Sequence, residues 1–374
     1  MRSYLIVIVS VLTLAVALSQ PVLAQGTTGN PSKGTARQFG TGQKTTGTVG
    51  SPSRGTARGI TTGGGTGGGG GGNAPLPGTI SLDLAGNNTV ILHCTLIRAG
   101  TFTMGSPVTE VGHEAEEEPL HQVTITKDYY SGTTEVTQIQ FITIMSTNPS
   151  NFQPPVVPAV ILGFDYRFLP VESVWHTDNR PGVTHVDAQL FCQRLGTKVV
   201  RRVRLPTEAE WEFAVRGGTQ TAYYFGAAPA PLPDHAWIAA NSGGVTHLTV
   251  DVPPSGLSPA NVNNKRPNPR GLHDVYGNVW EWCSDWYGAY VAGAATDPTG
   301  PRSGDYRVIR GGAYNSVAAT DCRSANRWWA WPDDPALHPL PWPNPAPSIW
   351  TIPPWPLPNT DYTTIGFRVV VEAP

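Results

Sequence analysis

The sequence predicts an α+β fold that is rich in loops and forms a single domain behind a long polar tether. Three features lead to this prediction. Short strand-like segments from about residue 90 to residue 106 are followed by three helical segments that end by residue 218. Beyond Gly218, short strands are joined by long connections dense in Pro, Gly, Asn and Trp. Residues 25–78 carry too few apolar side chains to build a core.

Residues 1–24 have the pattern of a secretory signal peptide. Arg2 supplies a positive start, an apolar run extends from Leu5 to Leu18, and Val22-Leu23-Ala24 forms a small-residue cleavage site. The alternative, a membrane anchor, requires an apolar stretch of about 20 residues, and this run is shorter. We therefore expect cleavage after Ala24, no membrane span in the mature chain, and export to the periplasm, the cell surface or the extracellular space.

Residues 25–78 are expected to form a disordered linker rich in Gly, Thr and Pro. A heptamer occurs twice in it, as PSKGTAR at 31–37 and PSRGTAR at 52–58, and a long glycine run follows. A segment with so few apolar groups cannot offset the entropy of ordering its backbone. Two polar copies are also too few for a repeat architecture. We interpret the segment as a flexible tether.

Charge and cysteine usage limit the classes of partner. The net charge is -2 and 14% of the residues are charged, so the sequence lacks the basic stripe that nucleic acid or an anionic membrane requires. The cysteines show none of the spacings of a zinc site. They are Cys94, Cys192, Cys283 and Cys322. In an exported protein they are expected to form one or two disulfides or to be buried thiols.

The domain is expected to begin with strands and to continue with helices. Ordered structure is predicted to return near Thr89. Strand-like segments follow at residues 90–92, 96–97 and 100–106. A first helix is predicted to open at Thr134 and to end at Asn148. A second helix is predicted over 187–195, with Gly196 as its C-cap.

A third helix has the clearest signal. Thr207 and Glu210 have the spacing of a capping box, in which each side chain binds a free backbone N–H at the helix start. Trp211, Ala214 and Val215 then face a core, and a Gly-Gly pair at 217–218 ends the helix.

Two stretches are predicted to be insertions into the domain, at about residues 176–186 and 328–362. The second is very rich in Pro and Trp, which favours extended, polyproline-like backbone. Its aromatic residues include Trp328, Trp329, Trp331, Trp342, Trp350 and Trp355. Such side chains either anchor a partner or a sugar or pack a long loop onto the domain. The sequence leaves both interpretations open.

Four sequence blocks occur in a fixed order beyond the tether. They are GTFTMGS at 100–106, VRLPTEAEWEFAVRGG at 203–218, PNPRGLHDVYGNVWEWCSDWYG at 267–288, and RVIRGGAYNS, CRSANR and GFRV within 307–369. Together they resemble the formylglycine-generating enzyme (sulfatase-modifying factor) family. The resemblance spans almost the whole chain after the tether, so the domain is assigned to residues 90–374. It implies a variant of the C-type lectin fold with little regular secondary structure.

In the third block the resemblance implies a calcium site. Its ligands by position are the side chain of Asp274, the backbone carbonyls of Gly277 and Val279, and the carboxylate of Glu281. The chemistry agrees, because Ca²⁺ prefers several hard oxygen ligands and a tight turn between two acids supplies them. The residues alone leave a second interpretation open. In it, Asp274 caps a turn and Glu281 pairs with an arginine such as Arg310 or Arg323.

The resemblance also implies an activity, the conversion of a sulfatase cysteine to formylglycine by two cysteines that hold copper(I). Soft thiolates are the ligands that copper(I) requires. Counting from Gly312 places Ser316 and Asp321 at the two thiol positions, and a hydroxyl and a carboxylate are hard ligands. Cys322 lies one residue beyond the second position. At least one thiol of the pair is therefore missing.

Cys322 is expected to have a structural role instead. The resemblance of the segment CRSANR implies that Cys322 occupies a structural position found in bacterial relatives. Its expected partner is Cys283, with which it would form a disulfide. A buried thiol is the alternative. Elsewhere, the acidic run from Glu114 to Glu118 is interpreted as a solvated loop.

Two functions follow from these residues. The first is a binding or interaction module that lacks the copper dithiol and binds a protein, a peptide or a glycan, with calcium as a structural ion. The second is a copper-dependent oxidase that acts on a co-exported sulfatase. The missing cysteine pair favours the first, and a shared fold does not establish activity.

Overall fold

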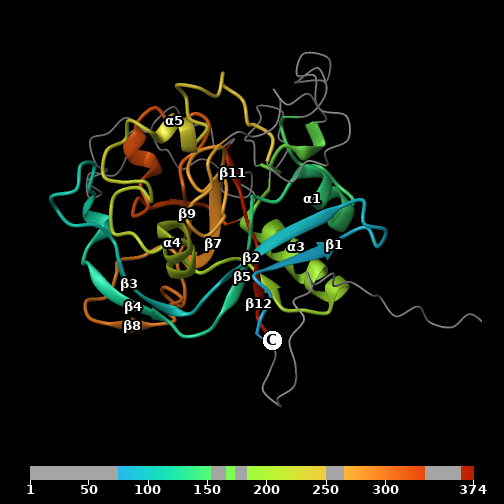
Figure 1. Ribbon diagram of the computed structural model, residues 1–374, viewed down its shortest axis with the longest axis horizontal. Helices are drawn as coiled ribbons and strands as arrows, with labels where there is room; N and C mark the ends of the chain where they lie inside the picture. The colour runs from blue at the N-terminus through green and yellow to red at the C-terminus, as the bar shows by residue number, and fades with distance from the viewer. Residues whose placement is uncertain (1–74, 153–165, 173–182, 250–264, 333–363) are drawn as a thin grey trace, which may run out of the picture. The chain divides into compact units, whose positions relative to one another are not determined.

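The computed structural model describes residues 75–152, 166–172, 183–249, 265–332 and 364–374 (Figure 1). All of them belong to the unit formed by Thr56–Pro374. The predicted signal peptide, nearly all of the tether and most of both predicted insertions lie outside the described residues. Among the described helices, none is both long enough and apolar enough to cross a membrane.

Short strands make up most of the regular structure. In chain order they are β1 (Thr79–Asp83), β2 (Ile91–Ile97), β3 (Gly100–Met104), β4 (His121–Ile125), β5 (Tyr129–Gly132), β6 (Val203–Arg204), β7 (Trp280–Trp286), β8 (Ala295–Thr296), β9 (Arg307–Arg310), β10 (Trp328–Ala330), β11 (Ile365–Gly366) and β12 (Val370–Glu372). Within the described residues they form sheets with the strand orders β1-β2-β5-β12-β6, β10-β9-β7-β11 and β3-β4-β8.

The five-stranded sheet joins the two ends of the domain. β12 lies between β5 and β6 and pairs with both in antiparallel fashion, so the last residues of the chain sit inside the sheet (Figure 1). β1 pairs with β2 along its whole length, with Ile80 opposite Cys94. Ordered structure therefore begins before Thr89, where the sequence predicted its return. The alternating apolar residues Ile80 and Leu82 are buried on one face, but they are too few to stand out beside the tether.

The helices are α1 (Gln138–Met145), α3 (His185–Val199), α4 (Glu208–Arg216) and α5 (Leu232–His235), with 3-10 turns η1 (Ala115–Glu117), η2 (Tyr166–Phe168) and η4 (Ala319–Cys322). The predicted capping box of α4 is confirmed, because Thr207 Oγ1 accepts from the backbone N–H of Glu210 while the Glu210 carboxylate accepts from that of Thr207. Gly217 ends the helix with a positive φ.

Two predicted helices have wrong boundaries. α1 starts after Thr137 and not at Thr134, because Val136 exchanges hydrogen bonds with Phe367 and Val171 in extended backbone. α3 starts at His185, inside the predicted first insertion, and continues through Gly196 to Val199. A Cβ atom at Gly196 would lie 2.8 Å from the carbonyl oxygen of Arg201, so this glycine permits a close backbone approach and is not a C-cap.

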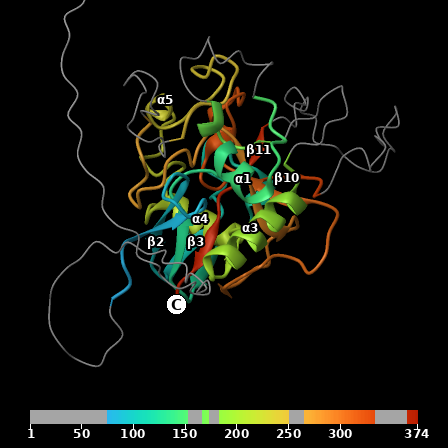
Figure 2. The same ribbon diagram turned by 90° about the vertical axis from the view of Figure 1, so that its right-hand side faces the viewer.

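The described core has two large apolar clusters. One joins α4 to the three-stranded sheet and includes Trp211 and Phe213. In the other, α1 and α3 lie side by side against the five-stranded sheet (Figure 2). The Phe141 and Phe191 rings stack there at 5.7 Å, with Phe367 edge-on to both. Between these clusters, α4 contacts β7 and β9, which brings the motif-bearing segments together.

Candidate functional site

α4 is the centre of a buried network of charged side chains. All of its residues are buried, including Glu208, Glu210 and Glu212. Glu212 Oε1 accepts from the backbone N–H of Gly105 at 3.0 Å and from Arg216 Nε at 2.8 Å. Its Oε2 pairs with Arg310. The first, second and fourth of the sequence blocks described above therefore meet at the carboxylate of Glu212.

Glu208, at the first turn of α4, binds two more cations. Arg327 donates to both of its oxygens, at 2.8 and 2.6 Å, and Arg310 Nε lies 3.3 Å from Oε1. Burial alone raises the pKa of Glu208, but Arg327 and Arg310 outweigh it and hold the pKa below its usual value. Tyr290 adds a hydroxyl donor at 3.1 Å. We call Glu208, Glu212, Arg216, Arg310 and Arg327 the α4 network.

Glu281, at the end of the predicted calcium loop, is also bound by an arginine. Arg368, which follows β11, donates to its carboxylate, with Nε to Oε2 at 2.6 Å and Nη2 to Oε1 at 2.5 Å. Trp211 Nε1 donates to the same Oε2 at 2.7 Å. An ion pair of Glu281 was one of the two interpretations of the sequence, but Arg310 and Arg323 were the wrong partners.

Three buried carboxylates gather around this loop. Asp274 and Glu281 are each 1% exposed, and Glu135, from the segment before α1, is fully buried. Neither carboxylate oxygen of Glu135 has a hydrogen-bond partner among the described residues. Burial, followed by the charges of Asp274 and Glu281, raises the pKa of Glu135 well above its usual value, against the opposing effect of Arg368. We call Glu135, Asp274, Glu281 and Arg368 the acidic cluster.

The backbone of the 274–281 loop makes tight turns. Asp274, Gly277 and Asn278 all have positive φ, of 53°, 74° and 54°. A Cβ atom at Gly277 would lie 2.0 Å from the carbonyl oxygen of Trp237, so only glycine fits there.

The acidic cluster has the charge that a cation site needs. In the described part of the chain, no group of three or more His, Cys, Asp or Glu side chains could hold a metal ion by itself. A calcium ion would therefore also need backbone carbonyls as ligands. The predicted set includes them, at Gly277 and Val279, beside the carboxylates of Asp274 and Glu281. Arg368 and Trp211 already bind the carboxylate of Glu281. The carboxylate of Glu135 has no hydrogen-bond partner among the described residues, so an added positive charge fits best beside Glu135.

Ser316 and Asp321 stand where the resemblance implies the thiol pair, and the structure buries Ser316 but leaves Asp321 partly exposed. Ser316 is 7% exposed, and its Oγ accepts from the backbone N–H of Ala313 at 3.1 Å. Cys322 is fully buried and hydrogen-bonded to Ser316 and to the backbone of Gly277. Burial raises the pKa of Cys322 well above its usual value and raises the pKa of Asp321 to about 6. This turn holds a neutral thiol beside a hydroxyl.

The predicted disulfide between Cys283 and Cys322 is not formed. Cys94, Cys192, Cys283 and Cys322 are all buried, and none of them is joined to another. Cys283 and Cys322 belong to the same apolar cluster, so the alternative of buried thiols describes them. The interpretation of the acidic run as a solvated loop is also wrong in one place, because Glu117 is fully buried and pairs with Arg323 at 2.5 Å.

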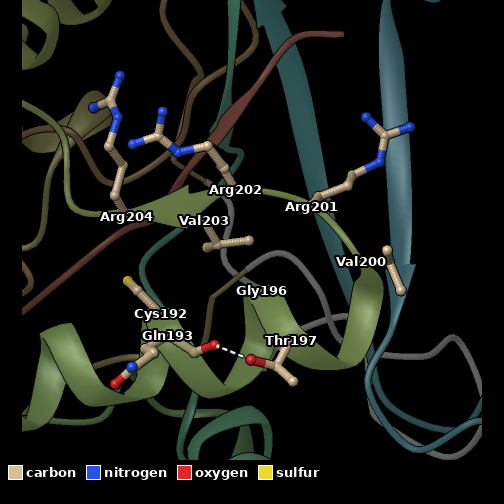
Figure 3. Close-up of a pocket in the computed structure, with 9 residues that line it drawn as sticks. All are labelled: Cys192, Gln193, Gly196, Thr197, Val200, Arg201, Arg202, Val203 and Arg204. Carbon is tan, nitrogen blue, oxygen red and sulfur yellow. Dashed lines mark hydrogen bonds between the residues drawn. The ribbon is translucent and has the colours of Figure 1, made fainter.

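One cavity among the described residues lies away from this site. It has a volume of about 420 Å³ between the second half of α3 and β6, and its lining includes Cys192 and Gly196. In Figure 3 the side chains of Arg202 and Arg204 extend away from α3. Arg204 is bound by Glu210 at 2.6 and 2.7 Å. The cavity contains none of the residues predicted as ligands or thiol positions.

Comparison with solved structures identifies the class of fold. Treponema denticola variable protein 1 is similar with a TM-score of 0.58 and 25% identity, covering 80% of this chain and 100% of that one. PvdO from Pseudomonas aeruginosa has a TM-score of 0.56 and 22% identity over the same shares. Residues 84–338 match the model of the sulfatase-modifying factor enzyme 1-like domain, so the chain belongs to this family.

Relatives in the family carry different names. The formylglycine-generating enzyme of Thermomonospora curvata is 37% identical over 180 residues, which cover 45% of this chain and 56% of the relative. The serine/threonine-protein kinase pkn1 of Chlamydia pneumoniae is 32% identical over 248 residues, 64% of this chain and 35% of the relative. The chain thus spans only part of the length of these relatives.

Proposed function

We propose that this chain is an exported, non-catalytic member of the family that acts as a binding module. The observation that carries the proposal is the pair formed by Ser316 and Cys322. A hydroxyl stands where copper(I) chemistry needs a thiolate, and the neighbouring thiol is buried and held neutral. These residues do not fit copper(I).

Export and calcium are parts of the same proposal. The signal-peptide pattern of residues 1–24 supports export. The acidic cluster supports a structural calcium ion at Asp274, Gly277, Val279 and Glu281, where its charge would offset buried carboxylates. The family resemblance implies the C-type lectin variant of the fold for this scaffold.

A turnover assay tests the proposal. The purified chain is incubated with oxygen, copper(I) and a cysteine peptide carrying the sulfatase motif, and mass spectrometry follows the peptide thiol. We expect no loss of the thiol. A Cys322→Ser variant serves as the matched control, because it removes the thiol next to Ser316.

The alternative function is the copper-dependent oxidase. The similarity to enzymes named formylglycine-generating enzyme favours it. Peptide turnover that disappears in Cys322→Ser would establish this alternative and overturn the binding-module proposal.

A further inference from the structure

Exposed apolar side chains gather around the loop that joins β3 to β4, residues 105–120. In the described part of the chain, seven large apolar side chains are exposed, and five of them lie on this loop or on segments that contact it. Val108, Val111 and Leu120 belong to the loop, Val291 follows β7, and Val317 precedes η4. Their exposed fractions range from 43% for Leu120 to 84% for Val317. We call these five residues the apolar surface.

The turn that carries Val317 is held against the loop. Gly112 packs so closely on the side chain of Thr320 that a Cβ atom would not fit between them. Arg323 is buried, and it donates to the carbonyl oxygen of Gly112 and, at 2.8 Å, to the carboxylate of Glu110. A guanidinium with several partners in one loop fixes that loop in place. The turn and the loop therefore present their exposed valines on adjoining segments.

The segment that carries Val291 also contacts the loop region. The rings of His121 and Tyr290 lie 4.9 Å apart. Each of them is the chain neighbour of a member of the apolar surface, Leu120 in one case and Val291 in the other. Arg327 joins the same two regions, because its Nη1 donates to one backbone carbonyl oxygen in each, at 3.0 and 2.9 Å. Contiguous exposed apolar groups of this kind mark interaction surfaces.

The charged side chains exposed on the loop are all acidic. Among residues 105–120, which the structure describes in full, they are Glu114, Glu116 and Glu118. Arg323 and Arg327, which hold the loop in place, are buried and form ion pairs with other carboxylates. The apolar surface is therefore accompanied by exposed negative charge.

We infer that the apolar surface binds a protein segment that carries both apolar and basic side chains. The apolar side chains of such a partner would cover the valines, and its cations would pair with the exposed acids of the loop. A second copy of the chain fits poorly, because a symmetric contact places the same acids against each other. The same charge disfavours an anionic membrane. This inference rests on the proposed function, because it names the partner class of the binding module.

Fluorescence anisotropy with model peptides tests the inference. The probe is a labelled peptide of four Leu-Lys-Gly repeats, into which the full chain is titrated. Two matched peptides replace every Lys by Glu or every Leu by Ser. We expect the Leu-Lys-Gly peptide to bind at least about tenfold more tightly than either matched peptide, because only it carries both kinds of side chain.

Variants at exposed positions locate the binding. The double variant Val111→Ser, Val317→Ser removes two apolar contacts, and we expect it to raise Kd about tenfold. Glu114→Gln should raise Kd less and should weaken its dependence on salt. Val200→Ser, at a valine that is 86% exposed at the end of α3, should bind like the parent chain. Because all these positions are exposed, each variant should keep the parent melting temperature.

Three results would overturn the inference. The first is that the Leu-Lys-Gly peptide does not bind the parent chain. The second is that it binds the folded double variant as tightly as the parent chain. The third is that either matched peptide binds as tightly as the Leu-Lys-Gly peptide. None of these results touches the proposed lack of catalysis, which fails only if the cysteine peptide is turned over.

Discussion

The α4 network and the acidic cluster are built from the same kinds of buried side chain, but their charges balance differently. In the α4 network, Glu208 and Glu212 are each bound by arginine. In the acidic cluster, Arg368 binds Glu281, while the Glu135 carboxylate has no hydrogen-bond partner in the described chain. In the first region the carboxylate charges are therefore offset by arginines, whereas a proton or a cation would stabilise the second.

Breaking the α4 network should have the largest effect. Arg310→Met leaves Glu208 and Glu212 short of a buried partner, and we expect a loss of about 3–5 kcal/mol in the free energy of unfolding. Urea unfolding measures it. Arg98→Met, which removes an exposed pair with Asp128, should cost about 1 kcal/mol or less. Equal losses of unfolding free energy in Arg310→Met and Arg98→Met would contradict the stabilising role assigned to Arg310 in the α4 network.

Calcium should act on the acidic cluster alone. At a concentration about 100-fold above Kd, a bound ion adds about 2.7 kcal/mol to the free energy of unfolding. We expect calcium to raise the melting temperature and a chelator to lower it, with no response in Asp274→Asn. Glu110→Gln, in a different acidic segment, should respond like the parent chain. A melting temperature of the parent chain that does not change when the chelator is added would refute the proposed calcium site.

Without calcium, Glu135 should make stability depend on pH. Its pKa in the folded chain is raised above 4.5, so the stability it contributes is fully present below pH 4.5 and is lost as pH rises towards the folded pKa. The charged groups that face it are Asp274, Glu281 and Arg368. We expect a slope of up to about 1.4 kcal/mol per pH unit, absent in Glu135→Gln. Urea unfolding at several pH values above 4.5, in chelator, checks the difference in slope.

The smallest effect concerns the start of α4. Thr207→Ala removes one half of the capping box and should cost about 1 kcal/mol. Thr197→Ala, which loses only an exposed contact with the Gln193 carbonyl within α3, should cost less. Thermal unfolding of the two variants compares their losses of stability. If Thr207→Ala were as stable as the parent chain, tertiary contacts alone would fix the start of α4.

Local sequence signals predicted the parts of the fold that depend on neighbours in the chain. The capping box at Thr207 and the stop at Gly217 were found because both act over one helical turn. The start of α1 was missed because Val136 bonds to Phe367, far away in the sequence. Arg368 as the partner of Glu281 was missed for the same reason.

By itself, the sequence determined the resemblance to the family, the order of the motif blocks, and that Ser316 and Asp321 stand where the resemblance implies the thiol pair, since these are properties of residue identity and spacing. Only the tertiary structure decided which carboxylate receives which arginine, that Glu135 joins Asp274 and Glu281, and that the cysteines are buried thiols. The burial of Glu135 and the pairing of Glu281 with Arg368 are set by residues distant in the chain, so no local pattern encodes them.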